Sequence, residues 1–198
     1  MFARTATSND INLVFKLGIK NANEWANQFD HYRNLRIEDK NLVLAEYGIA
    51  FLLIDEAFKA KKEDGKLQKK SRSNSENTGK GTENFVENLE KAVSRPIRKL
   101  EIDEFECAVL KTLLLLASSF PGRINFKNKP QPIHKCLSEL MVHLTQKFPE
   151  YSPERFGELI LLLGSIRCAV KTVYNQTKIP GIFHFNNFDQ CLKNIFLT

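Results

Sequence analysis

The chain has 198 residues and a formal net charge of +6, and 42% of its residues are hydrophobic. This size and apolar content suit one globular domain with its own core. No apolar run is long enough to cross a bilayer, and the segment MFARTATSND lacks the apolar stretch of a signal peptide, so neither a membrane protein nor a secreted one is expected. Four cysteines without C-x-x-C spacing predict reduced thiols, as in the nucleus or cytoplasm.

Residues 10–60 predict two long helices. From Asp10 to about Asn34, apolar residues recur at three- and four-residue spacing without a Gly–Pro break, and from Glu38 to Lys61 they occupy more than one side. Residues 61–84 are rich in Lys, Ser, Asn and Gly and almost free of apolar side chains. Such a segment cannot bury enough surface to offset its chain entropy, so we expect a disordered basic loop.

Residues 85–177 predict the remaining helices. Phe85 to Leu100 forms one, interrupted near Pro96, because proline lacks the N–H of the helical ladder. Asp103 opens the next helix, and Glu106 three residues later completes the pattern of a capping box. Ile133 to Phe148 is an amphipathic helix.

The stretch from Arg155 to Gln176 predicts a long helix whose first turns are apolar nearly all round. A helix of that kind is buried in the middle of a fold or shared with a partner. Ser152 is suited to cap its first free N–H groups. After a Pro180–Gly181 break, residues 186–198 form a short amphipathic tail. With no strand periodicity and no internal repeat, the chain is predicted to be a single all-α domain.

No group of residues has the spacing of a catalytic or metal site. The histidines are scattered singly, and GKGT at Gly79 to Thr82 lacks the strand and helix that flank a phosphate-binding loop. We therefore predict that the chain is not an enzyme and needs no cofactor.

Four stretches, in order along the chain, resemble the ligand-binding domain of nuclear hormone receptors. EWANQFDHYRNLRIEDKNLVL, at 24–44, is similar to the family signature E-W-A-K-x-x-P-x-F-x-x-L-x-x-x-D-Q-x-x-L-L. EFECAVLKTLLLL resembles the eighth helix of the family, and RFGELILLLGSIR resembles the start of the tenth in retinoid X and hepatocyte-nuclear-factor-type receptors. DQCLKNIF resembles the mobile activation helix. The divergent nematode receptors share this general look.

The resemblance implies an antiparallel helical sandwich around an apolar pocket for a lipophilic ligand, fatty-acid-like or steroid-like, in a nuclear regulator of transcription. The positions implied to face this pocket are Val14, Phe15, Gly18, Ile49, Leu52, Val173 and Gln176. Plain core packing would use the apolar members of this set in the same way. Lys59 stands where retinoid-type receptors have an arginine for the ligand carboxylate, so it is either an acid-binding residue or a solvated lysine.

The resemblance also implies a coregulator groove, with the positions Asn27, Leu44, Leu192, Asn194 and Ile195. In the family, a lysine and a glutamate cap the two ends of a leucine-rich helix bound there. Here Asn27 and Asn194 replace them, and Ala45 replaces a second basic residue. Because asparagine lacks the charge, we expect weak, ligand-independent or absent coactivator recruitment.

Arg155, Leu162 and Arg167 fall near the surface that receptors use to dimerise, which implies a homodimer or a heterodimer with nuclear receptors. The sequence begins inside the family's domain and carries no Cys-rich zinc module, so a domain without its first helix and without direct DNA contact is expected. The alternative is an inert or dominant-negative helical dimerisation module with a filled core and no ligand.

Overall fold

The computed structural model describes residues 8–64, 87–117, 130–176 and 190–196, and the regular structure within them is helical. The elements are α1 (Ser8–Ala26), α2 (Asp30–Arg33), α3 (Ile37–Asp64), the π-helix η1 (Glu90–Ser94), α5 (Arg95–Lys99), α6 (Glu104–Leu116), α7 (Pro130–Lys147), α8 (Ser152–Gln176) and α9 (Gln190–Phe196). The predicted all-α class is confirmed.

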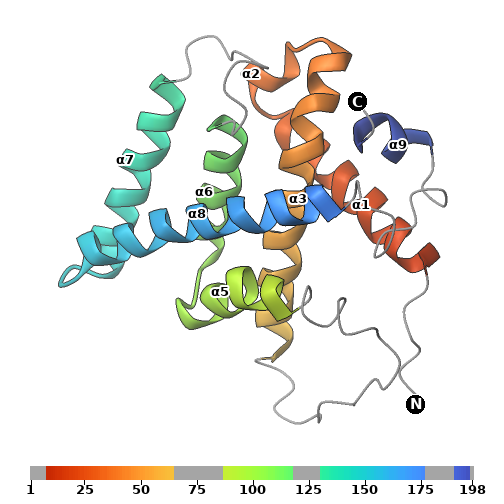
Figure 1. Ribbon diagram of the computed structural model, residues 1–198. Helices are drawn as coiled ribbons and strands as arrows, with labels where there is room; N and C mark the ends of the chain where they lie inside the picture. The colour runs from red at the N-terminus through yellow and green to blue at the C-terminus, as the bar shows by residue number, and fades with distance from the viewer. Residues whose placement is uncertain (1–7, 65–86, 118–129, 177–189, 197–198) are drawn as a thin grey trace.

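The central helix of the fold is α3. It contacts α1, α6, α8, α9, η1 and α5, whereas α8 crosses it and continues towards α7 (Figure 1). The middle of α3 is buried on all sides, with Ile49, Ala50, Phe51 and Ile54 each at most 5% exposed. The α8 helix buries one face, which includes Leu159, Leu163 and Ile166, but its first turns are not covered all round, since Leu161 is 75% exposed.

The first long helix predicted over residues 10–34 is in fact two helices. After Ala26 the backbone tightens, with Phe29 N–H donating to the Ala26 carbonyl at 3.0 Å. Asn27 Nδ2 donates back to the Asn23 carbonyl at 2.8 Å, and Tyr32 Oη donates to Asn23 Oδ1 at 2.7 Å. Asparagine side chains that bond the local backbone compete with the helical ladder. The prediction of one helix missed this competition.

The predicted interruption near Pro96 is present as a change of helix type. Residues 87–89 are α-helical, η1 follows, and Pro96 lies in the first turn of α5. Because proline donates no hydrogen bond and crowds the preceding turn, the ladder widens into a π-turn just before it.

The boundaries of other elements also differ from those predicted. α3 extends to Asp64, so residues 61–64 are helical and not part of a loop; the rest of the predicted loop, 65–84, lies outside the described residues. Pro180–Gly181 and the tail positions 186–189 and 197–198 lie outside them as well. Ser152, which we expected to cap α8, is already the first residue of that helix. The N–H of Arg155 donates to the Tyr151 carbonyl, so the capping position is Tyr151.

The capping box at the start of α6 is confirmed. Asp103 Oδ1 accepts from the Glu106 N–H at 2.7 Å, and Glu106 Oε2 accepts from the Asp103 N–H at 2.9 Å. Asp103 Oδ2 also accepts from Lys147 Nζ at 2.7 Å and lies 2.8 Å from His143 Nε2, both on α7. Partial burial raises the pKa of Asp103, but the hydrogen bonds from Glu106, Lys147 and His143 outweigh it and lower the pKa to about 2.

Stability should therefore depend on pH through Asp103. Its folded pKa is below its ordinary value of 3.8, so its contribution is present above that pH and disappears as the pH falls towards 2. We expect Asp103→Asn, which keeps a good N-cap, to be less stable than the wild type at neutral pH, with the difference shrinking between these two values. Urea unfolding across this pH range measures it; a difference that stays constant would contradict the assignment.

Candidate functional site

An apolar cavity of about 450 Å³ lies between α1, α3, the η1 segment and α8. Its lining residues are Val14, Phe15, Ile49, Leu52, Leu53, Glu56, Ala57, Ala60, Leu89, Ser94 and Val173. Val14, Phe15, Ile49, Leu52 and Val173, predicted from the family register, are thus brought together by three helices far apart in sequence. The cavity is large enough for a small lipophilic molecule.

Gly18 and Gln176 do not line this cavity. Gly18 lies against Leu52, and a Cβ at Gly18 would be 2.7 Å from Leu52 Cδ1. The glycine therefore allows α1 and α3 to approach closely beside the cavity, which is a packing role. Gln176 is half-buried at the last position of α8.

Lys59 also lies outside the lining. Its Nζ bonds Asp55 Oδ2 at 2.7 Å and Glu56 Oε1 at 3.1 Å, and its side chain is 55% exposed. The hydrogen bond that Lys59 donates to Asp55 is the main cause that raises the pKa of Lys59. Two carboxylates already bind this ammonium group. Lys59 is therefore not placed to bind the carboxylate of a ligand in the cavity.

The polar part of the lining consists of Glu56 and Ser94, which the sequence interpretation did not single out. Glu56 continues the stripe of Ile49 and Leu52 at helical spacing, so the periodicity could have revealed it. Ser94 lies on η1, and no sequence signal placed that segment against α3. The Glu56 carboxylate and the Ser94 hydroxyl can each accept a hydrogen bond from a hydroxyl or an amine.

The helix α9 packs against α3 through Leu192, Ile195 and Phe196, which are at most 3% exposed. The rings of Phe196 and Phe15 meet edge to face, with centroids 6.1 Å apart. Because Phe15 also lines the cavity, it joins the cavity to the C-terminal helix.

The five residues predicted for a coregulator groove divide into two groups. Leu44 is buried on α3, and Leu192 and Ile195 are buried on α9, which packs against α3. Asn27 is bonded to Asn23, and Lys40 Nζ lies 3.5 Å from Asn27 Oδ1, so a cation that sequence reasoning missed lies at this position. Asn194 is exposed, and its Oδ1 accepts from Gln190 Nε2 at 2.8 Å within α9.

The three residues predicted for dimerisation have contacts inside the fold. Arg155 is 6% exposed and makes two hydrogen bonds, of 2.9 and 2.8 Å, to the carboxylate of the fully buried Glu106. Leu162 is 3% exposed. Arg167 is half-buried and donates to the Ala117 carbonyl at 2.9 Å, at the carboxyl end of α6. The Arg155 and Leu162 side chains are therefore core residues of the described fold.

The outer face of α8 instead exposes Leu161, which is 75% exposed, and Ile160, which is 38% exposed. The sequence did not predict this exposed face. The first turns of α8 are apolar nearly all round, so the periodicity could not show which of Leu161 and Leu162 is buried. Leu161 is the most exposed large hydrophobic residue of the described chain.

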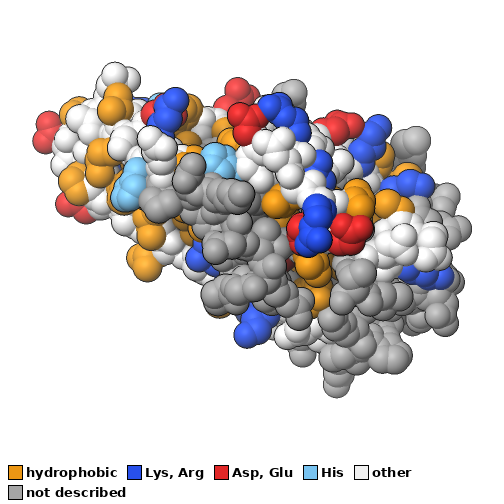
Figure 2. All heavy atoms as spheres, turned by 90° about the horizontal axis from the view of Figure 1, so that it is seen from above, with side chains coloured by type: hydrophobic (Ala, Val, Ile, Leu, Met, Phe, Trp, Pro, Cys, Tyr) orange, Lys and Arg blue, Asp and Glu red, His pale blue; other side chains and the backbone are white. Residues whose placement is uncertain are grey.

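Neither a metal site nor a membrane span is found in the part of the chain that the structure describes. Within it, no three acidic, histidine or cysteine side chains gather to hold a metal ion, and no helix is long and apolar enough for a bilayer. On the face seen in Figure 2, the described basic and acidic side chains are interspersed and form no continuous basic patch. Such a patch is the usual feature of a nucleic-acid surface.

The fold and cavity together define an all-α domain that encloses an apolar site between helices and packs a short C-terminal helix beside it. The sequence profile described as the ligand-binding domain of nuclear hormone receptor matches residues 1–183. The chain therefore belongs to the nuclear hormone receptor ligand-binding domain family. No curated protein matches the chain.

Proposed function

We propose that this domain binds a small lipophilic ligand in the cavity between α1, α3 and α8 and thereby regulates transcription in the nucleus. The carrying observation is that five of the eight residues implied by the family resemblance, Val14, Phe15, Ile49, Leu52 and Val173, line one cavity of about 450 Å³. The family is generally non-enzymatic, in keeping with a binding role. Its members act through lipophilic ligands and dimerisation in general, and this chain's own partners are part of the proposal.

The Glu56 carboxylate in the cavity lining favours a lipophilic alcohol or amine over a fatty acid. Glu56 would accept a hydrogen bond from a ligand hydroxyl, whereas a ligand carboxylate would meet a like charge. Lys59 does not reverse this preference, because it is bonded to Asp55 and Glu56. Of the two ligand types implied by the resemblance, the steroid-like alcohol fits this lining better than the fatty acid.

Blocking the cavity should abolish this binding. Val14 lines the cavity and is 47% exposed, so Val14→Trp can fill its mouth without overpacking the core. We expect the affinity for a fluorescent sterol to fall by at least about tenfold, since a bulky ring occupies space that the ligand needs. Fluorescence titration of the full chain measures the change.

Leu13→Trp is the matched control, because Leu13 is 55% exposed on the same helix and does not line the cavity. It should leave sterol affinity unchanged. A parallel titration with dodecanol and dodecanoate tests the headgroup preference, and Glu56→Lys should shift the preference towards dodecanoate. Equal loss of sterol binding in both tryptophan variants would argue against this cavity as the site.

Weak coactivator recruitment also stays part of the proposal. Asn27 and Asn194 lack the charges that would grip a leucine-rich helix, although Lys40 brings one ammonium group next to Asn27. Titration with a leucine-rich peptide tests this, and tight binding that is lost in Asn194→Ala would contradict it.

A second candidate function is dimerisation or another protein contact through α8. The observation that favours it is Leu161, whose side chain is 75% exposed on the outer face of that helix. Mass spectrometry of lipid extracted from the purified chain, together with sedimentation, separates the two functions. A chain that carries no lipid, ignores the sterol and binds another protein would favour the second.

A further inference from the structure

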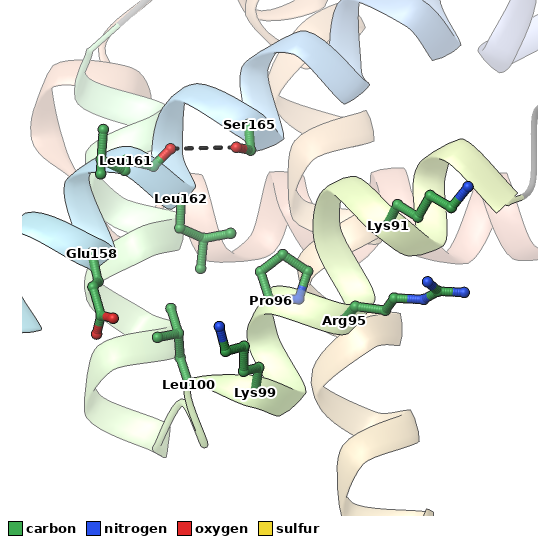
Figure 3. Close-up of a pocket in the computed structure, with 9 residues that line it drawn as sticks. All are labelled: Lys91, Arg95, Pro96, Lys99, Leu100, Glu158, Leu161, Leu162 and Ser165. Carbon is green, nitrogen blue, oxygen red and sulfur yellow. Dashed lines mark hydrogen bonds between the residues drawn. The ribbon is translucent and has the colours of Figure 1, made fainter.

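A second hollow, of about 380 Å³, lies on the outside of the fold between α8 and the η1–α5 segment (Figure 3). Its apolar floor is formed by Pro96 and Leu100 on one side and by Leu162 on the other. Figure 3 shows Leu162 and Pro96 pointing towards each other across the groove. Because Leu161 stands exposed at its margin, the groove and its rim keep apolar surface in water that a partner could bury.

One rim of this groove is basic. Lys91, Arg95 and Lys99 recur at four-residue spacing along η1 and α5, so they lie on one side of that segment. Lys91 pairs with Glu87 at 2.8 Å and Arg95 with Glu90 at 3.5 Å.

These pairs leave the rim available to a partner. Each of the four side chains in them is at least 41% exposed, and exposed pairs of this kind are worth little and exchange readily. Lys99 is exposed and pairs with no carboxylate among the described residues. Among the residues that line the groove, the one carboxylate is that of Glu158 on α8.

The shape of the α8 side suits a helix. A Cβ added at Gly157 or at Gly164 would meet nothing within 4 Å, so space is open on both sides of Leu161. A partner backbone could therefore approach α8 closely, with Leu161 as an apolar anchor between the two glycines.

We propose that this groove docks an amphipathic helix of another protein, with an apolar stripe over Leu161 and Leu162 and an acidic flank against Lys91, Arg95 and Lys99. A second copy of the chain fits less well. The lining residues themselves include three cations and one carboxylate, so an acidic flank complements them better than the same lining of a second copy would. The inference rests on α8 as a partner surface and is independent of the ligand cavity.

Two synthetic helical peptides with the same leucine stripe, one flanked by glutamates and one by lysines, test this proposal on the full chain. Fluorescence anisotropy should show that the glutamate peptide binds at least about tenfold more tightly, with an affinity that falls as salt rises. Lys91→Glu with Lys99→Glu should reverse the preference. Leu161→Ala should lower the affinity for the glutamate peptide by about tenfold, because an apolar anchor is lost.

The matched control is Lys20→Glu with Lys135→Glu, which makes the same charge change at side chains 68% and 78% exposed on α1 and α7. It should leave the preference for the glutamate peptide intact. Equal binding of both peptides, or the same effect of the control pair, would overturn the proposal. Sedimentation that shows a dimer abolished by Leu161→Ala would assign the groove to a second copy instead. Circular dichroism verifies the fold of each variant, and none of these outcomes depends on sterol binding.

Discussion

Replacing Arg155 with alanine should lower the free energy of unfolding by about 3–5 kcal/mol, the usual cost of removing one partner of a buried ion pair. Arg155 is 6% exposed and holds both carboxylate oxygens of Glu106, which is fully buried. Without the guanidinium, Glu106 keeps its capping bond to the Asp103 N–H, but its charge is left in the core. Urea unfolding followed by circular dichroism measures the loss.

Two comparisons make this result specific. Arg98→Ala removes an exposed pair with Glu90, and its cost should be about 0–1 kcal/mol. Glu106→Gln keeps an acceptor for the capping box and removes the charge. Combined with Arg155→Met, it should cost less than the sum of the two single changes, because neither partner is then a charge without its counter-ion. Additive costs would mean that the two residues do not stabilise the fold as a pair.

The features that depend on local sequence could be predicted well. Periodicity identified the helices, and the Asp103–Glu106 spacing identified the capping box, because both depend on residues within one or two turns. The resemblance to the receptor family predicted the cavity residues for a different reason. It carries tertiary information that periodicity lacks, and so it linked Val14, Ile49 and Val173 across three helices.

The features that depend on contacts between distant helices could not be predicted. The family resemblance assigned Arg155 to the dimerisation surface, and only its partner Glu106, on another helix, explains why this charged side chain is buried. Leu161 and Leu162 are neighbours on an apolar stretch, and packing alone decides that Leu162 is inside. Lys59 is a different case, because its partners Asp55 and Glu56 lie one turn back on the same helix and their spacing could have revealed them.

Replacing Phe196 with alanine should release α9 from the fold. A seven-residue helix has almost no stability by itself, so α9 is ordered by packing. Phe196 is fully buried and meets Phe15 edge to face, and a phenylalanine-to-alanine change at such a site costs about 3–5 kcal/mol. Because this cost falls on a local docking equilibrium, the amides of residues 190–196 should exchange as in a free peptide, while global unfolding changes little.

Hydrogen exchange of the full chain measures this release, and Phe105→Ala is the matched control. Phe105 is 38% exposed and stacks on His143, so the same chemical change there should leave exchange in α9 as in the wild type. Equal protection of α9 in both variants would show that Phe196 does not hold it. The same experiment links the helix to the proposed function. Since Phe15 contacts both the cavity and Phe196, added sterol should slow exchange in α9 of the wild type but not of Phe196→Ala.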